Sequence, residues 1–169
     1  KYDRHGIQVG DHLQTSVPNI YASGDVVRSR EPKLTPTAIF QSTYLMKLFS
    51  GVTDAPISYP TIPTVVFTSP RIAEMGVPVA KAENDDSLKV VHHALHGDWY
   101  RQVYKEQIAD LSLVFNQKHQ LVGATEISDR ADDSIDSLLP AVEMKMTPEQ
   151  IGRMVDLFPS ISSAVCANL

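Results

Sequence analysis

The residues best suited to chemistry lie near the start of the chain, where a short apolar run is followed by a glycine and an aspartate. The run covers residues 20–22, and it ends at Gly24 and Asp25. It predicts a buried strand, and the glycine permits a tight turn and the close approach of a ligand. A carboxylate just past the carboxyl end of a strand lies where open α/β sheets bind cofactors, and it can accept hydrogen bonds from sugar-type hydroxyls. The alternative is an aspartate that only ends the strand in a turn.

A predicted helix follows, and its amino end would face a ligand in the same cleft. Thr35 suits the N-cap, Pro36 suits the first helical position, and Gly51 suits the residue that stops the helix. Because little purely polar face remains, we expect this helix to be largely buried. Its apolar positions are Ile39, Phe40, Leu45, Met46, Leu48 and Phe49. Free N–H groups and the positive end of the helix dipole suit a reduced flavin, which carries negative charge on its pyrimidine side.

These two segments carry a resemblance to a known family. Residues 15–25 (Thr-Ser-Val-Pro-Asn-Ile-Tyr-Ala-Ser-Gly-Asp) and 34–38 (Leu-Thr-Pro-Thr-Ala) resemble the second FAD-binding motif of the pyridine nucleotide-disulfide oxidoreductases. Glutathione reductase, dihydrolipoamide dehydrogenase and mercuric reductase belong to that class. The resemblance implies that Asp25 binds the ribityl region of FAD and that Thr35 offers its backbone N–H to the flavin ring. The implied cofactor-binding set is Gly24, Asp25, Leu34, Thr35 and Ala38.

Composition limits the other possibilities. The 169 residues suffice for one sizeable core, and 43% of them are hydrophobic, as in ordinary globular proteins. The formal net charge of −5 gives no basic footprint for nucleic acid or an anionic membrane, and no apolar run approaches a membrane span. We therefore expect neither nucleic acid nor membrane as a partner. A single cysteine, Cys166, excludes an internal disulfide and a redox cysteine pair within this chain, and such low cysteine content agrees with a cytoplasmic location.

The opening of the chain indicates a piece of a longer protein. The first residue is Lys1 rather than Met, and residues 1–15 lack the Gly-rich phosphate loop that a cofactor domain needs. We expect residues 1–57 to be the carboxyl-terminal remnant of an α/β FAD-binding domain. The proline-rich residues 58–63 form a connector, and residues 58–169 form a second domain. FAD and NAD(P)H are then the cofactors of the full-length parent, and none is expected in this fragment.

Periodicity predicts an α+β fold for the second domain, with an antiparallel sheet flanked by helices. A strand or hairpin is also predicted at residues 5–13. The predicted strands of the second domain are 64–68, 87–95, 109–115 and 121–127, with a bulge at Gly123. The predicted helices are 70–76, 131–146, 147–155 and 161–167. The first of them starts after Ser69 and ends at Gly76, and the third opens with a capping box at Thr147. Residues 98–107 are ambiguous and could hold a helical turn.

The start of the second domain resembles the interface domain of the same family. In residues 62–76, a strand of the type Pro-Thr-Val-Val-Phe-Thr leads to a proline, a short helix and a glycine, at the expected place after the FAD motif. The resemblance implies that residues 58–169 form the dimerisation domain. We therefore expect a homodimer, with the two-fold symmetry that is usual for such pairs.

Four further groups of residues are better explained by structure than by chemistry. His92, His93 and His96 fall in a predicted strand without a nearby carboxylate, so no metal site is predicted. An acidic group suggests a solvated helix start rather than a calcium loop, because the loop glycine is missing. Its members are Asp129, Asp132, Asp133 and Asp136. Trp99 and Tyr100 are expected to be core or interface aromatics, and Cys166 is expected to be inert packing.

The last segment departs from the pattern of disulfide reductases. There the sequence His-Pro-Thr-x-x-Glu supplies a histidine that acts as acid and base across the dimer interface and a glutamate that orients it. Aligned on Pro159, this chain has Phe158 at the histidine position and Ser163 at the glutamate position. Neither side chain moves protons at neutral pH, so no catalytic residue is predicted in this chain. Mercuric reductases carry an aromatic residue near there, but their terminal cysteine pair is not matched here.

These features predict the carboxyl-terminal part of an FAD-dependent NAD(P)H oxidoreductase that acts on a small-molecule substrate. The fragment would serve dimerisation and part of the FAD site, and it would be inactive alone. The alternative is a non-catalytic interaction protein built from a degenerate interface domain. The sequence upstream of Lys1 distinguishes them, because a Gly-x-Gly-x-x-Gly motif and a Cys-x-x-x-x-Cys pair would establish a disulfide reductase.

Overall fold

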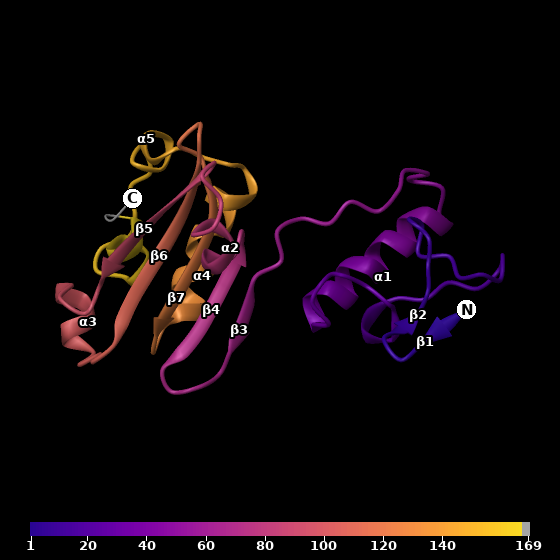
Figure 1. The fold of residues 1–169 in the computed structure, drawn as a ribbon, viewed down its shortest axis with the longest axis horizontal. Helices are drawn as coiled ribbons and strands as arrows, with labels where there is room; N and C mark the ends of the chain where they lie inside the picture. The colour runs from indigo at the N-terminus through magenta and orange to yellow at the C-terminus, as the bar shows by residue number, and fades with distance from the viewer. Residues whose placement is uncertain (167–169) are drawn as a thin grey trace. The chain divides into compact units, whose positions relative to one another are not determined.

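A computed structural model describes residues 1–166 of the chain. The chain divides into two compact units between Ile62 and Pro63, within the proline-rich residues 58–63 (Figure 1). We call them the first unit and the second unit and describe each by itself. No helix in residues 1–166 combines the length and the apolar character that crossing a bilayer requires.

The first unit consists mainly of loops packed against one helix. Its elements are the hairpin of β1 (Tyr2–Asp3) and β2 (Gly6–Ile7), the 3-10 turn η1 (Gly24–Val26) and the helix α1 (Thr35–Phe49). Two loop residues, Leu13 and Val27, are each only 1% exposed and form the centre of this packing. The loops are tied to one another by main-chain bonds, such as the one from Ala22 N to Leu13 O at 3.0 Å. This packing holds η1 against α1.

The strand predicted at residues 20–22 is wrong. Tyr21 forms only an isolated bridge with Gln14, and Ile20 is 51% exposed. Ile20 closes a turn instead, because its N–H donates to the carbonyl of Val17 at 3.0 Å. The hairpin predicted at residues 5–13 lies earlier in the chain, at β1 and β2, and residues 10–13 form a turn in which Leu13 N donates to Gly10 O at 3.0 Å. A short apolar run beside a turn therefore packs here without a sheet.

The prediction that α1 is largely buried is also wrong. Within the first unit, its buried side chains are Thr37, Gln41 and Tyr44, which face the loops. The apolar side chains of Ile39, Met46 and Phe49 are instead 61%, 72% and 62% exposed. The helix therefore presents a mostly polar stripe to its own unit and an apolar surface to solvent. As predicted, Gly51 follows the helix end, and its φ of +71° is a conformation that favours glycine.

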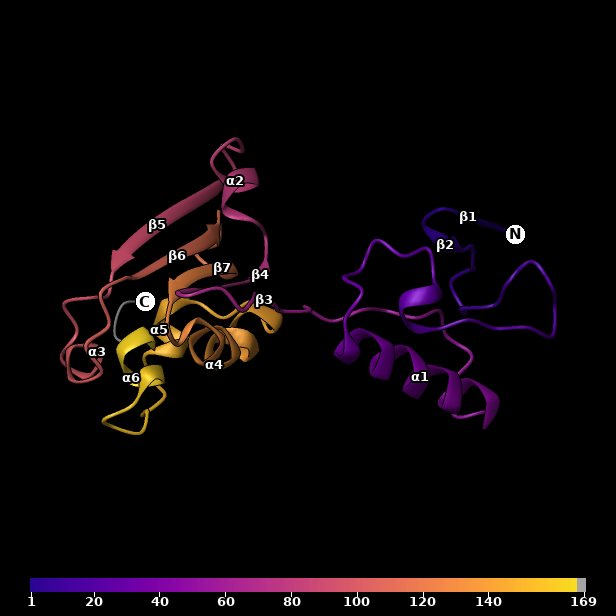
Figure 2. The ribbon, with the colours of Figure 1, turned by 90° about the horizontal axis from the view of Figure 1, so that it is seen from below.

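The second unit is built on a five-stranded antiparallel sheet with the strand order β3-β4-β7-β6-β5. The strands are β3 (Thr64–Val66), β4 (Arg71–Gly76), β5 (Leu88–Ala94), β6 (Ala109–Asn116) and β7 (Leu121–Ser128). The helices are α2 (Val79–Ala82), α3 (Trp99–Val103), α4 (Ala131–Glu143), α5 (Pro148–Ile151) and α6 (Ile161–Cys166). Figure 2 shows α4, α5 and α6 on one side of the sheet. The predicted α+β fold is confirmed.

Alternation of side chains along β6 creates the core of this unit. Leu111 and Leu113 are fully buried and belong to one core cluster with Ile135 and Leu138 of α4. Burying one such side chain contributes about 1.5–3 kcal/mol. The predicted strands at 109–115 and 121–127 are confirmed, as is the predicted helix at 131–146, although it ends at Glu143.

The helix predicted at residues 70–76 is wrong, because this segment is strand β4. Its buried residues, Ala73 and Met75, alternate with exposed ones, and Met75 pairs with Ala124 of β7. Ser69-Pro70 and Gly76 resemble helix caps, but the two-residue burial period decides the structure.

The helix predicted from Thr147 begins as expected but ends early. Thr147 and Gln150 form the predicted capping box, with bonds of 3.3 Å and 2.9 Å. The helix stops at Ile151, so the prediction that it reaches Val155 is wrong. Val155 is 99% exposed, which means that no packing supports a longer helix. The predicted final helix corresponds to α6, and its expected last residue, Ala167, lies outside the described residues.

Two paired glycines allow β4 and β7 to meet closely at one end of the sheet. Gly76 pairs with Gly123 and has a φ of +68°. A Cβ on Gly123 would lie 2.3 Å from the carbonyl oxygen of Val77, so only glycine fits. The sheet register shifts beside this point, between Val114 and Phe115 of β6, where Val114 is the partner of Gly123. Because Val114 pairs with Gly123 and Phe115 pairs with Leu121, the extra residue of this bulge is Val122 on β7, directly beside the predicted position.

A buried polar cluster joins α3, β7 and α4. Arg101 donates from Nη1 to Glu106 Oε2 at 2.9 Å and from Nη2 to Glu126 Oε1 at 2.9 Å. The hydroxyls of Ser128 and Ser134 donate to the same Glu126 oxygen, at 2.6 Å and 2.9 Å. Every member is 5% exposed or less. Burial raises the pKa of Glu126, although the Arg101 charge and the hydrogen bonds to the carboxylate oppose that rise.

Arg101→Ala is expected to lower the free energy of unfolding by about 3–5 kcal/mol, because it leaves buried carboxylates without their cation. Urea unfolding followed by far-ultraviolet circular dichroism measures this loss. Arg130→Ala is the control, since Arg130 pairs with Asp133 at the surface, with side chains 40% and 51% exposed. The control should lose about 1 kcal/mol or less. Equal losses in the two variants would contradict the role assigned to Arg101.

Candidate functional site

The first unit contains a hollow of about 410 Å³ at the amino-terminal part of α1. Three of the residues predicted to bind a cofactor line it, namely Asp25, Thr35 and Ala38. The other walls come from one side of the helix and are formed by Ile39, Ser42, Thr43 and Met46. The two segments singled out in the sequence therefore meet in space, with η1 on one side and α1 on the other.

Gly24 and Leu34 flank this hollow without lining it. Gly24 has a φ of +74°, and a Cβ there would lie 3.3 Å from the Cβ of Ala38, so glycine keeps η1 close to the helix. Leu34 is the N-cap of α1, which corrects the prediction that Thr35 holds that position. Since Leu34 offers no side-chain acceptor and the first turn has no acidic residue, the positive end of the helix is left uncompensated by the protein.

The carboxylate of Asp25 is exposed and has no hydrogen-bond or ion-pair partner within residues 1–166. Its backbone carbonyl is occupied, because Lys33 Nζ donates to it at 2.7 Å and to the carbonyl of His5 at 3.0 Å. The main chain at Asp25 is thus fixed, while the side chain remains available to hydroxyl donors. This combination suits a carboxylate that receives hydrogen bonds from a polyol.

Gln41 is a positioning residue that the sequence analysis missed. It is 1% exposed, its Oε1 accepts the N–H of Gly24, and its Nε2 donates to Tyr59 OH at 2.9 Å. Gln41 therefore holds η1 and the loop after α1 against the same helix. Its spacing from Thr37 and Tyr44, the other buried residues of α1, follows one helical face and could have revealed it.

Phe158 and Ser163, which the sequence analysis aligns with an acid–base pair, make local contacts in the structure. Phe158 is 75% exposed and stacks on Trp99, with ring centroids 6.0 Å apart and planes inclined by 25°. Ser163 lies in the first turn of α6, where its hydroxyl donates to the carbonyl of Ser160 at 2.9 Å. Phe158 therefore has a packing contact, and Ser163 has a contact that caps the start of α6.

The histidines, the acidic group and Cys166 have the following surroundings in the structure. His92 contacts Ser112 at 2.8 Å across the sheet, and no group of three potential metal ligands was found among the described residues. Of the acidic group, Asp132 pairs with Arg71 at 2.7 Å, an interaction that lowers its pKa. Burial raises the pKa of the Cys166 thiol to about 11, which disfavours the reactive thiolate.

Comparison with protein families gives two matches that together cover most of the chain. The family described as "Pyridine nucleotide-disulphide oxidoreductase, dimerisation domain" matches residues 62–168. The family described as "Pyridine nucleotide-disulphide oxidoreductase" matches residues 1–42, which include Asp25 and Thr35. The first match falls on the second unit and the second match on the first unit.

Similar proteins fall into two length classes. The chain is 30% identical to the "Uncharacterized 19.7 kDa protein in mercuric resistance operon" of Staphylococcus aureus, over 98% of this chain and 94% of that protein. It is 29% identical to glutathione reductase of Nostoc sp., over 92% of this chain but only 34% of the reductase. The fold matches the HOCl-induced flavoprotein disulfide reductase RclA of Escherichia coli with a TM-score of 0.85 at 18% identity, over 98% of this chain and 38% of that one. The chain thus spans about a third of the reductases.

Phe158→Ala is expected to shift the fluorescence emission of Trp99 to longer wavelength, because the stacked ring shields one face of the indole from water. The measurement is specific, since Trp99 is the chain's single tryptophan. Leu157→Ala is the control, because Leu157 is 80% exposed and makes no ring contact with Trp99. Unchanged emission in Phe158→Ala would show that the two rings do not stack in solution.

Proposed function

The chain belongs to the pyridine nucleotide-disulphide oxidoreductase family, and we propose that it is the carboxyl-terminal part of an FAD-dependent NAD(P)H oxidoreductase. In this proposal the second unit serves subunit dimerisation, and the first unit supplies part of the FAD site. The observation that carries the proposal is the hollow at α1, where Asp25, Thr35 and Ala38 come together.

The Asp25 carboxylate and the amino end of α1 in the first unit suit the polar groups of a flavin. Asp25 would accept hydrogen bonds from the ribityl hydroxyls, and the backbone N–H of Thr35 would face the flavin ring at the uncompensated amino end of α1. Gly24, Leu34 and Ala38 would shape this approach. When bound, FAD supplies hydride and electron transfer with NAD(P)H. The 169 residues carry no Gly-rich pyrophosphate loop, so we expect this fragment alone to bind no FAD.

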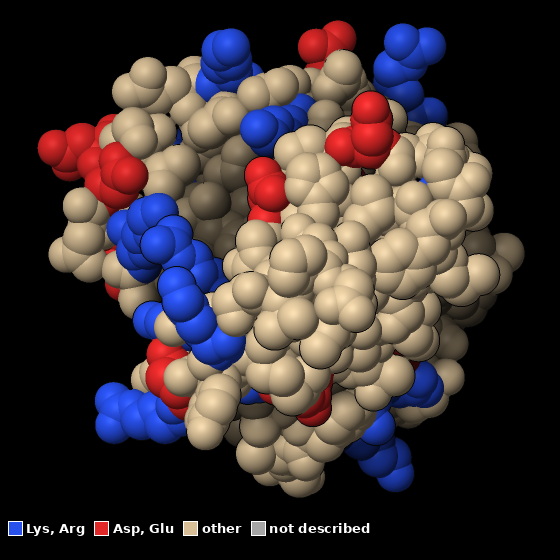
Figure 3. Space-filling view, turned by 90° about the vertical axis from the view of Figure 1, so that its right-hand side faces the viewer, with Lys and Arg blue, Asp and Glu red and all other residues tan. Residues whose placement is uncertain are grey.

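The apolar side of α1 supports the same proposal. Ile39, Met46 and Phe49 are each more than 60% exposed, and isolated domains seldom expose so many apolar side chains along one helix. Figure 3 shows how the charged side chains are distributed over one face of the molecule. We propose that the rest of an FAD-binding domain covers the apolar side of α1 in the parent protein.

The second unit offers an apolar strip for a second copy of itself. We define this strip as Trp99, Val155, Leu157 and Phe158, which are 59%, 99%, 80% and 75% exposed. Aromatic and aliphatic side chains of this kind form the centres of protein interfaces. A homodimer through the second unit would bury them. The net charge of −5 supports the proposal that the protein binds neither nucleic acid nor membrane, and the single cysteine supports the proposal of a cytoplasmic location.

The chain is expected to sediment as a dimer at micromolar concentration, and Leu157→Asp should raise the dimer dissociation constant at least about tenfold by placing a charge in the strip. Sedimentation equilibrium measures both values. Met144→Asp is the control, since Met144 is 74% exposed but lies at the end of α4, outside the strip. A monomeric wild-type chain at micromolar concentration would overturn the proposed dimer.

The segment around Phe158 limits the chemistry of the parent. Reduction of a disulfide substrate needs a proton donor for the leaving thiolate, and general acid–base help contributes about 10²–10⁴ in rate. Phe158 offers only an aromatic face, and Ser163 caps α6. We propose that the parent transfers hydride or electrons to acceptors that need no such donor, such as a quinone, a metal ion or a second nicotinamide nucleotide.

In the full-length parent, disulfide reduction is therefore expected to be slow relative to quinone reduction. The double change Phe158→His with Ser163→Glu should raise disulfide reductase activity, while Leu157→His with Ser162→Glu, which shifts the same residue types by one position, should not. Steady-state assays with glutathione disulfide, lipoamide and a quinone test this. High disulfide reductase activity in the unaltered parent would refute the assignment.

The alternative is a non-catalytic interaction protein made of a degenerate interface domain. The length of the staphylococcal relative favours it, because that protein is matched over 94% of its own length. The reading frame upstream of Lys1 separates the two proposals. A Gly-x-Gly-x-x-Gly motif with a Cys-x-x-x-x-Cys pair there supports a disulfide reductase, the glycine motif alone supports another flavin-dependent activity, and neither motif supports the interaction protein.

A further inference from the structure

We propose that a pocket of the second unit, between β5 and the turn after β6, binds a small aromatic carboxylate or phosphate. The pocket has a volume of about 470 Å³, within the range of small-molecule sites. It lies wholly in the second unit and shares no residue with the hollow at α1. The inference is therefore independent of the proposed flavin chemistry.

The walls of the pocket are apolar and come from separate elements. Val91 lies on β5, Phe115 on β6, and Pro148 is the first residue of α5. Val91 packs against the core, and Phe115 is only 8% exposed, so these two walls are held by the core of the unit. Flat apolar walls of this kind favour an aromatic ring as ligand.

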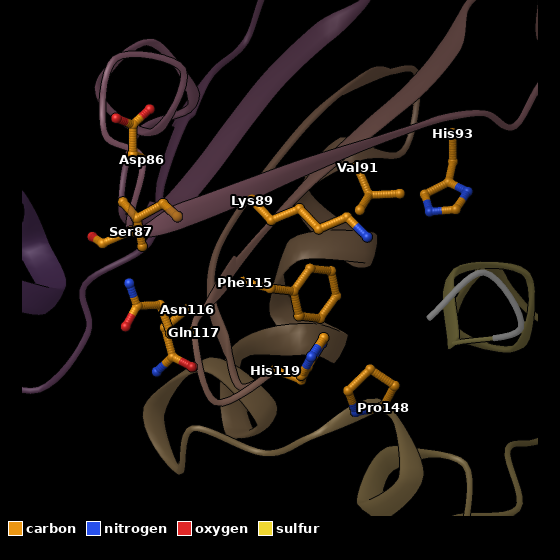
Figure 4. Close-up of a pocket in the computed structure, with 11 residues that line it drawn as sticks. Asp86, Ser87, Lys89, Val91, His93, Phe115, Asn116, Gln117, His119 and Pro148 are labelled. Carbon is orange, nitrogen blue, oxygen red and sulfur yellow. The ribbon is translucent and has the colours of Figure 1, made fainter.

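Cationic and imidazole side chains converge on the same space. Lys89 and His93 flank Val91 on the same face of β5, because alternate residues of a strand point the same way. Figure 4 shows Lys89 and His93 extending toward the side of the pocket that holds His119, with Asp86 at the other end. In the described part of the chain, the side chains of Lys89, His93 and His119 have no hydrogen-bond or ion-pair partner. These groups can therefore bind an anion.

The turn that presents His119 is stabilised by hydrogen bonds to one side chain. His119 has a φ of +55°, an uncommon conformation outside glycine in which asparagine, aspartate and histidine are enriched. Asn116 Oδ1 fixes the turn by accepting the N–H groups of Lys118 at 2.9 Å and Gln120 at 3.1 Å. The backbone at residue 119 would also accept glycine or asparagine, and the histidine found there adds an imidazole to the pocket.

The test is titration of the 169-residue chain with phenyl phosphate, benzoate, benzamide and inorganic phosphate, followed by two-dimensional amide NMR. We expect both aromatic anions to change the amide chemical shifts of Lys89, Phe115 and His119, with dissociation constants of about 1 mM or lower. The neutral benzamide and the ring-free phosphate should each bind about tenfold more weakly. Shifts spread over the whole surface, or equal binding of benzamide, would overturn the proposal.

Substitutions at Lys89 test whether its ammonium group binds the anionic group of the ligand. Lys89→Gln should weaken phenyl phosphate binding about fivefold and Lys89→Glu at least about tenfold, while benzamide binding stays unchanged. Lys118→Gln is the matched control, because Lys118 lies on the turn that carries His119 but does not line the pocket. Since Lys89 is exposed, the amide spectrum of each variant should remain that of the folded chain. Equal weakening by Lys118→Gln would mean non-specific attraction and would refute the site.

Discussion

The ion pairs of Arg101 are the interaction on which the second unit most depends. A guanidinium with no exposed surface is tolerated only because the carboxylates of Glu106 and Glu126 meet it at 2.9 Å. Those contacts join α3 to the middle of the sheet, and Ser134 extends the same network into α4. Within residues 1–166, Arg101 Nε and one oxygen of each glutamate lack a partner, so no member can be removed without adding to the unpaired buried groups.

The same short helix connects this interior to the surface. Asp98 caps α3 by accepting the N–H groups of Tyr100 and Arg101 at 2.9 Å and 3.3 Å. The helix then sends Arg101 inward and leaves Trp99 59% exposed beside Phe158. A helix of five residues has little stability of its own, so its position depends on the cap and the buried ion pairs. Trp99, and through its ring contact Phe158, is therefore positioned in the proposed dimer strip by charges in the core.

The sequence predicted the strands whose apolar alternation is bounded by a polar turn, and it failed where proline and glycine suggested helix caps and where polar side chains are buried. Residues 109–115 and 121–127 were identifiable because alternate positions are apolar and a polar turn separates them. Residues 70–76 misled because proline and glycine resemble helix caps, whereas pairing with β7 makes the segment a strand. Gln41 and Arg101 were not identified, since polar side chains are usually exposed and their partners lie far along the chain. Asp25 and Thr35 were found from motif spacing, and the structure brings them to one hollow.

The two units differ in how completely each buries its own apolar side chains. The second unit closes a core around β6, β7 and α4, in which Leu111, Leu113 and Leu121 have no exposed surface. The first unit instead buries a glutamine and a threonine along α1 and leaves its larger apolar side chains open. A helix gains most of its stability from packing an apolar face, and this supports the proposal that α1 packs against the rest of an FAD-binding domain in the parent. The Asp25 carboxylate, which has no hydrogen-bond partner in the described part of the chain, lines the same hollow as Ile39 and Met46. The exposed apolar side of α1 and an available hydrogen-bond acceptor are therefore neighbours.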